Sequence, residues 1–256
     1  MRVFKFVSSI LASLVLVTVT APSAQADVPP IPLTCGMVIK QDAKVYLAKD
    51  LRCPTFGVRV QSDFSGEVPG PTVVIDLRGH TLRGPGTGEG ITAFSGGQGI
   101  TFVTVTNGRL KNWDIAVGGD WDFRTRNVAL VNNRIGFYCS SICVADRTHF
   151  KGNTGIGFNA GADASSTVTR STFVRNAVGA AVSFIWTLRI DNSVFRKNDV
   201  GVLADNARVT VSKSLFVRNR TAVKVLTGDL EEPCATLQQV VFVRNTVNLD
   251  GERCPA

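Results

Sequence analysis

The phrase Ser171-Thr172-Phe173-Val174-Arg175-Asn176 returns along the chain almost to its C-terminal end. Each return keeps Phe in third place and Asn in sixth, and the returns lie at 193–198, 214–219 and 240–245. One short phrase therefore recurs in register, and we take its Phe as the anchor of a repeat.

The repeat begins well upstream of this phrase. Phe150, Leu130 and Leu110 stand at the anchor position of three earlier repeats, and Asn follows in frame after the first two. After Leu110 the frame holds Trp113 instead of Asn. From Leu110 the seven anchors are 20, 20, 23, 22, 21 and 26 residues apart. A period this short and regular indicates a solenoid whose coils stack on one another.

Apolar and polar residues alternate before each anchor. The fifth and seventh residues upstream are mostly apolar, and those between them are mostly polar. This alternation indicates a strand with one face inward, and a second short strand follows the Asn, as in 178–182. The sequence therefore predicts an all-β parallel β-helix of about eight coils. Because neighbouring strands lie about 4.8 Å apart, we expect the Phe residues to stack and the Asn residues to form an amide ladder.

The first 26 residues have the pattern of an export signal. Arg2 and Lys5 give a basic start, an apolar run covers 10–19, and Ala24-Gln25-Ala26 is a small-x-small cleavage site. That run is too short to span a bilayer, and no later stretch approaches ~20 apolar residues. We therefore expect a secreted, extracellular monomer with no membrane span.

The mature chain is expected to form one elongated domain. Residues 27–70 would form a lead-in with a capping first coil, and 71–256 would form the repeats. The full chain has 28 basic and 20 acidic residues, so removing Arg2 and Lys5 leaves 26 against 20, a net charge of about +6.

Six cysteines in an exported chain indicate three disulfides, for which fifteen pairings exist. Their spacing favours one pairing, because two separations, 18 and 20 residues, are close to one coil. Bridges at these spacings would clip the terminal coils, and a third would close a local loop. The expected pairs are Cys35–Cys53, Cys139–Cys143 and Cys234–Cys254. Metal binding by these thiols is the alternative.

The N-terminal part carries a more specific pattern. It reads Cys35-Gly36, then Asp50-Leu51-Arg52-Cys53-Pro54, then Ile75-Asp76-Leu77-Arg78-Gly79-His80-Thr81-Leu82 with Gly84 and Gly86. This string resembles the opening of secreted bacterial right-handed parallel β-helix proteins of the pectate-lyase-like superfamily. The resemblance implies a three-sided, right-handed helix with an N-terminal cap, often associated with polysaccharide.

The same resemblance implies two kinds of enzyme, polysaccharide lyases and glycoside hydrolases. Both need carboxylates close together, either to hold calcium or to act as a catalytic pair. The best candidates are Asp120 and Asp122, which a folded loop could bring to Asp146. The superfamily's hydrolase motifs (Asn-Thr-Asp, Asp-Asp, Gly-His-Gly and Arg-Ile-Lys) are missing. We therefore expect no cofactor, with calcium at these aspartates as the alternative.

Matching registers of adjacent coils hold opposite charges more often than paired acids. These positions predict surface ion pairs, namely Arg126 with Asp146, Asp114 with Arg134, and Asp199 with Arg220. The two histidines are not placed for catalysis, and His149 has no acidic neighbour in the frame.

A column of basic residues is the most prominent candidate site. Two residues past the anchor, four successive repeats carry Arg175, Lys197, Arg218 and Arg244. If these face outward they form a cationic stripe, which an extended acidic polymer would neutralise. Trp186 and Trp113 could add flat surfaces for sugar rings. The alternative is an ordinary solvated face with a positive bias.

These patterns predict a secreted protein that binds an acidic polysaccharide or a cell-envelope glycan. The alternatives are a polysaccharide lyase or glycoside hydrolase, and a non-catalytic surface rod. Nucleic acid would also suit the charge, but because the chain is expected to be exported we expect no nucleic-acid partner.

Overall fold

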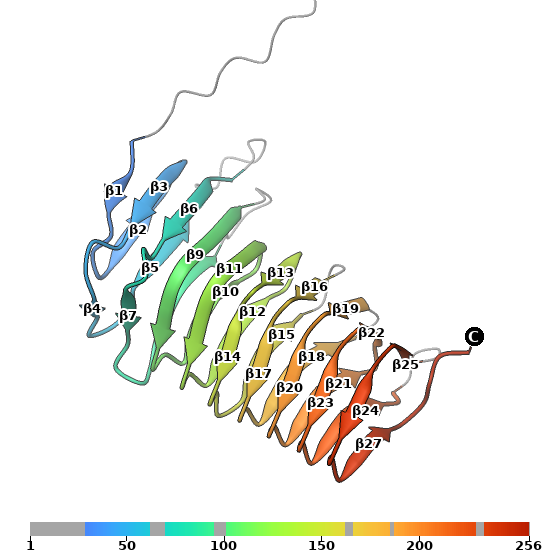
Figure 1. Ribbon diagram of the computed structural model, residues 1–256. Helices are drawn as coiled ribbons and strands as arrows, with labels where there is room; N and C mark the ends of the chain where they lie inside the picture. Colours follow the sequence, from blue (N-terminus) through green and yellow to red (C-terminus); the bar gives the residue numbers. More distant parts are fainter. Residues whose placement is uncertain are drawn as a thin grey trace, which may run out of the picture.

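The computed structural model describes residues 29–61, 70–94, 101–161, 166–184, 187–228 and 233–255. Within these ranges every regular element is a β-strand. The strands stack into an elongated solenoid that runs from the N-terminal to the C-terminal end of the chain (Figure 1). The predicted export signal at 1–26 and Trp186 lie outside the described residues.

Each turn of the solenoid contains up to three strands, which stack into three parallel columns that we number I, II and III in chain order. Column I holds the strand upstream of the anchor and column II holds the anchor. Two long strands, β9 (Phe102–Lys111) and β11 (Asp122–Val131), run through both columns and join them into one 17-stranded sheet.

The remaining strands of column I are β1 (Ile31–Pro32), β3 (Ala43–Tyr46), β6 (Thr72–Asp76), β13 (Cys143–Asp146), β16 (Ser166–Thr169), β19 (Thr187–Asp191), β22 (Arg208–Ser212) and β25 (Cys234–Gln238). Those of column II are β4 (Leu51–Arg52), β7 (Thr81–Arg83), β14 (His149–Lys151), β17 (Thr172–Val174), β20 (Val194–Arg196), β23 (Leu215–Val217) and β26 (Val241–Val243).

Column III follows the ladder Asn and forms a separate 10-stranded sheet. Its strands are β2 (Met37–Ile39), β5 (Val58–Gln61), β8 (Glu89–Phe94), β10 (Ile115–Gly119), β12 (Ile135–Cys139), β15 (Ile156–Ala160), β18 (Val178–Ser183), β21 (Val200–Asp205), β24 (Thr221–Leu226) and β27 (Val247–Asp250).

The predicted parallel β-helix is therefore confirmed, with about nine turns rather than about eight. The short N-terminal strands account for the difference, because 27–70 carries no anchor phrase although strands β1 to β5 lie there. The right hand of the coil and the N-terminal cap stay predictions.

The repeated phrase itself forms a short strand, the strand of column II. Strand β17 covers only Thr172, Phe173 and Val174, with Phe173 buried between two half-buried neighbours. Three residues are too few to show a clear alternation, so the sequence indicated the strands on either side but not this one.

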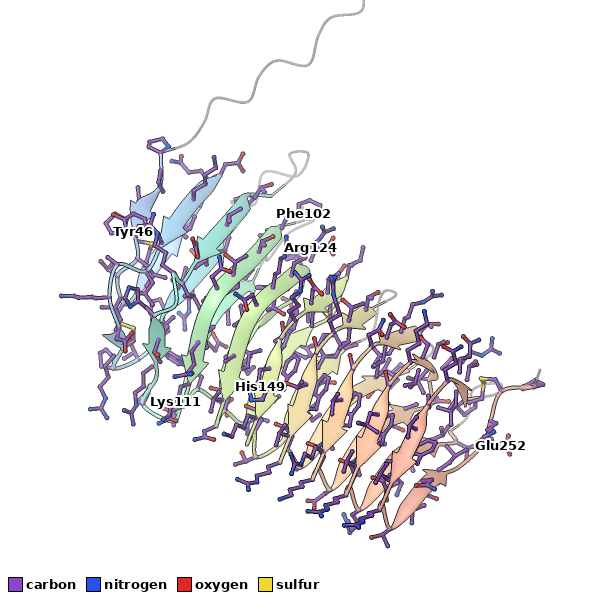
Figure 2. The ribbon with its side chains drawn as sticks, viewed as in Figure 1. Tyr46, Phe102, Lys111, Arg124, His149 and Glu252 are labelled. Atoms are coloured by element: carbon purple, nitrogen blue, oxygen red, sulfur yellow. A yellow bond between two sulfur atoms is a disulfide. The ribbon has the colours of Figure 1, made fainter. Side chains whose placement is uncertain are left out.

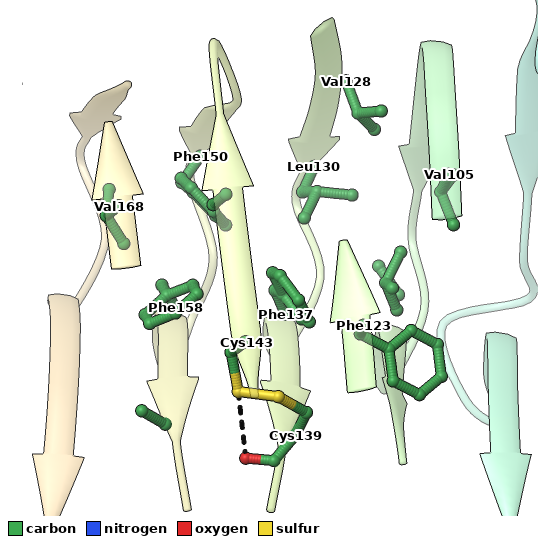
Figure 3. Packing of buried hydrophobic residues seen from close by; sticks show 14 of the residues in the cluster. Val105, Phe123, Val128, Leu130, Phe137, Cys139, Cys143, Phe150, Phe158 and Val168 are labelled. Carbon is green, nitrogen blue, oxygen red and sulfur yellow. Dashed lines mark hydrogen bonds between the residues drawn. A yellow bond between two sulfur atoms is a disulfide. The ribbon is translucent and has the colours of Figure 1, made fainter. Parts of the chain in front are cut away.

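The anchor residues form the predicted stack. The rings of Phe150, Phe173, Phe195 and Phe216 lie parallel, with centroids 4.5, 4.4 and 4.7 Å apart. Toward the N-terminal end, Phe123, Phe137 and Phe158 pack edge to face (Figure 3). Ring spacings close to the strand spacing show that one coil follows the next in register.

The Asn ladder is also present, at the corner between columns II and III. Asn198 donates from its backbone N–H and from Nδ2 to Oδ1 of Asn219, over 3.0 Å in each case. The same Nδ2 donates to the carbonyl of Phe173 in the preceding coil. The pattern repeats from Asn133 through Asn219, so each of these buried amides is satisfied by the coils on both sides. The ladder ends at the half-buried Asn245, whose Nδ2 donates to the carbonyl of Phe216.

Trp113 begins this ladder. Its backbone N–H donates to Oδ1 of Asn133, and its indole Nε1 donates to the carbonyl of Leu82, the contact that an Asn amide would make. A Cβ at Gly84 would come within 2.4 Å of the indole, so that glycine provides the space. Trp113 is 1% exposed, and its predicted role as a sugar platform is therefore wrong.

All three predicted disulfides are confirmed. Cys35–Cys53 joins the first two turns, and Cys139–Cys143 closes the turn between β12 and β13 (Figure 3). Cys234–Cys254 fixes the C-terminal tail, whose Arg253 pairs with Ala235 at the edge of strand β25.

Replacing a ladder residue is expected to destabilise the fold. Asn198→Ala removes the acceptor of two buried donors on Asn176 and the two donors of its own amide. We expect a loss of about 2–4 kcal/mol in the free energy of unfolding, measured by urea denaturation. Asn159→Ala, in an outward position of strand β15, is the control and should change it by less than about 0.5 kcal/mol. Equal effects of the two substitutions would contradict the role of the ladder.

Candidate functional site

The predicted basic residues lie at the corner between columns II and III, each directly before a ladder Asn. We call Arg175, Lys197, Arg218 and Arg244 the cationic row. Their backbones are left-handed, with φ of 55°, 56°, 53° and 53°. The preceding coils have the same conformation at this corner, in Asn112, Asn132 and Gly152.

Hydrogen bonds between coils impose this left-handed conformation. The backbone N–H of Arg175 donates to the carbonyl of Arg196, that of Lys197 to Val217, and that of Arg218 to Val243. Asn132 and Gly152 donate in the same way to the coil that follows them. The backbone of the corner is therefore fixed, while its side chain is free to differ from coil to coil.

Arg and Lys are costly choices at such a corner. A left-handed backbone costs roughly 1–2 kcal/mol for most residues and much less for Gly or Asn, which this chain uses three times at the same place. The four C-terminal coils nevertheless carry Arg or Lys. The requirements of the backbone therefore do not explain the charge.

The cationic row is exposed and unpaired. All four side chains are solvent-exposed, and none has a carboxylate within 4 Å among the described residues. Since neighbouring coils are about 4.8 Å apart, the row places like charges close together. Such charges repel one another by about 1 kcal/mol per pair in water, and a bound anion would relieve this repulsion.

Asp146, a predicted catalytic residue, is the centre of an ion-pair cluster in column I. Arg170 contacts its carboxylate at 2.6 Å, and Arg126 and Arg147 each lie at 3.9 Å. Partial burial acts to raise the pKa of Asp146, but hydrogen bonds from Arg170 and Thr169, with the charges of Arg170 and Arg147, lower it overall. An ionised, neutralised carboxylate of this kind is a poor proton donor.

The other two predicted catalytic residues lie at the start of strand β11. Asp122 is 7% exposed, and its Oδ1 accepts hydrogen bonds from Ser141 Oγ and from the backbone N–H of Ile142. Asp120 is exposed in the turn before the strand. Asp122 and Asp146 are four register positions apart, or about 13 Å, whereas glycosidases place their carboxyl groups roughly 5–9.5 Å apart. The structure therefore does not bring these two together as a pair.

Two of the three predicted ion pairs are confirmed. Arg134 contacts both carboxylate oxygens of Asp114, at 2.5 and 2.9 Å, and this hydrogen bonding lowers the pKa of Asp114. Arg126 lies near Asp146, as stated above. Asp199 and Arg220 form no ion pair within 4 Å, although both lie within the described ranges.

In the part of the chain that the structure describes, no three His, Cys, Asp or Glu side chains are grouped closely enough to hold a metal ion. Nor does any helix in that part have the length and apolar character to cross a membrane.

A second polar ladder, which the sequence did not predict, lies at the corner between columns I and II. The backbone N–H groups of Thr148, Ser171 and Ser193 donate to Oγ of Ser171, Ser193 and Ser214, respectively. The Ser that recurs at the start of the repeated phrase is the sequence pattern from which this ladder could have been predicted. This corner is left-handed too, at Arg147, Arg170, Asn192, Lys213 and Gln239.

Comparison with known proteins adds no family assignment. No protein-family model matches this chain, and no curated protein matches it significantly. The resemblance to the pectate-lyase-like superfamily therefore stays a prediction.

The Asp146 cluster predicts how stability depends on pH. Because the folded-state pKa is lowered, the ionised carboxylate stabilises the fold at neutral pH, and this stabilisation is lost as the pH falls below about 4. Asp146→Asn should lower the free energy of unfolding by at most about 1 kcal/mol at pH 7, because the arginines are half exposed. Urea denaturation should show this difference shrinking in acid. Asp199→Asn is the control, and an equal effect there would contradict the cluster's role.

Proposed function

We propose that this protein is a secreted β-helix protein that binds an extended acidic polysaccharide along the cationic row. The observation that carries the proposal is the choice of Arg or Lys at a left-handed corner in four successive coils, where earlier coils have Asn or Gly. That choice costs backbone energy and creates repulsion, and an anion that lies along the row relieves the repulsion.

The ligand is a polymer rather than a single small anion. The row repeats one charge per coil over four coils, so a chain with regularly spaced carboxylates can contact it several times. Each exposed contact contributes only about 0.2–1 kcal/mol, and useful affinity therefore requires several contacts in one molecule.

The three disulfides support the extracellular setting, because disulfides persist in oxidising compartments. The acidic sugar polymers of cell envelopes occur in that setting. The lyase or hydrolase alternative has less support, because Asp122 and Asp146 stand about 13 Å apart in register and Asp146 is neutralised by Arg170. We therefore propose binding.

The test replaces all four residues of the row with Asn, which suits a left-handed corner. We expect the affinity for polygalacturonate, measured by calorimetry at low salt, to fall about tenfold or more. The thermal midpoint should stay the same or rise, because Asn relieves backbone strain. Unchanged affinity in this variant would contradict the proposal.

A control variant separates the row from net charge. It removes the same number of positive charges elsewhere through Lys49→Gln, Arg52→Gln, Arg124→Gln and Arg189→Gln. In the view of Figure 2, Arg124 lies along the upper edge of the solenoid and His149 along the lower edge. The control should retain polygalacturonate binding, whereas an equal loss in both variants would show that only overall charge matters.

A further inference from the structure

A hollow lies on the outer face of column II, over Ala129 in strand β11. In register, Ala129 stands between Arg109 of strand β9 and His149 of strand β14. All three line the hollow, together with Asn127 and Arg147 at the neighbouring corner. We call this depression the Ala129 hollow.

The small side chain of Ala129 makes the depression. At the same register, later coils carry Thr172, Val194 and Leu215. Arg109 and His149 are two coils apart, or about 9.6 Å between their backbones, with only a methyl group between them. That gap can admit a small charged group.

The surroundings of the hollow are positive. Arg109 is exposed and has no carboxylate within 4 Å among the described residues. Lys111 and Lys151 flank Val131, two positions further along the same strands. His149 and Lys111 both lie along the lower edge of the solenoid in Figure 2. Two carboxylates lie near the rim, and both are bound by other groups. Asp146 contacts Arg170, and Oδ1 of Asp76 accepts hydrogen bonds from Nδ2 of Asn107 and from the backbone N–H of Arg78.

His149 faces these cations. Its Nδ1 is hydrogen-bonded with Oγ1 of Thr172 on strand β17, which leaves Nε2 for a ligand. Burial lowers the pKa of His149, and the charges of Lys151 on its own strand and Arg109 on strand β9 lower it further. Arg147, two residues before it, is a further cation at the rim. A bound anion would counter these effects and favour the protonated imidazole.

We infer that the Ala129 hollow binds one carboxylate-bearing sugar, and that it lies upstream of the cationic row on the same glycan path. Lys151 lies between the hollow and Arg175 of the next coil, because it is in register with Val174, the residue before Arg175. The inference rests on the proposed function, since it extends that site from a row of charges to a row with a shaped subsite.

The test uses digalacturonate, which is too short to span the row. We expect a saturable shift of the His149 imidazole resonances in NMR titrations of the wild-type protein. Ala129→Leu fills the hollow with the residue that stands in register at Leu215 and should weaken binding about tenfold or more. Arg109→Gln should do the same by removing charge, so the result does not depend on one variant.

The pH dependence gives a second readout. Affinity for digalacturonate should rise about threefold or more as the pH falls from about 7.5 to about 4.5, because the lowered pKa of His149 moves its protonation below the usual pH range and the protonated ring adds a charge. His149→Gln should remove that dependence. If affinity stays flat with pH in the wild-type protein, His149 does not take part in the subsite.

Failure of this inference can be distinguished from failure of the proposed function. The four-Asn variant of the cationic row should lose binding to polygalacturonate but keep binding to digalacturonate. Ala129→Leu should lose binding to digalacturonate but keep binding to polygalacturonate. Unchanged digalacturonate binding in Ala129→Leu would overturn the subsite. An equal response to maltose would overturn its basis in charge, and an equal response to inorganic sulfate would overturn its assignment to a sugar.

Discussion

The register of this solenoid depends on the Asn ladder at the corner between columns II and III. Each inner ladder amide bonds the coil after it and the anchor carbonyl of the coil before it, so three coils are tied together. Because the turn is fixed in this way, the residue before the Asn takes a left-handed backbone whatever its side chain. The same constraint stacks the Phe rings inside and aligns the outward residues in columns about 4.8 Å apart.

A solenoid of this kind suits a periodic ligand. A row of charges on rigid corners is already ordered before binding, so less conformational entropy is lost than with a flexible basic tail. The charges remain exposed, and their attraction for an acidic chain is therefore screened by salt. Such a surface can hold a polymer reversibly at many points, with each point contributing little.

Much of the fold could be predicted from the sequence, because the period is carried by conspicuous residues such as Phe173 and Asn176. The strand that contains Phe173 was hidden, since three residues show no clear alternation. Trp113 was predicted to offer a flat surface for sugar rings, but its side chain is buried. In fact its indole makes the hydrogen bond that the missing amide would have made.

The site was less predictable than the fold. The charges of the cationic row were visible in sequence, but an Arg-Asn pair gives no sign of the left-handed corner that makes those charges costly. The Ala129 hollow could not be predicted from the sequence. Arg109, Ala129 and His149 follow one another at intervals of about one coil, and they become neighbours only when the coils stack in register. The repeat in the sequence shows which residues share a column. Whether those residues leave a depression between them depends on how their side chains pack, and this is visible only in the three-dimensional structure.

If the cationic row binds one acidic chain at successive coils, affinity should depend on the length of that chain. The decisive measurement is therefore the affinity for oligogalacturonates of increasing length. We predict that affinity rises with each added sugar until the ligand spans the row and hollow and then levels off, while neutral oligosaccharides of equal length do not bind. Affinity that is independent of length would contradict the claim, because it would mean that the ligand meets a single charge rather than the row.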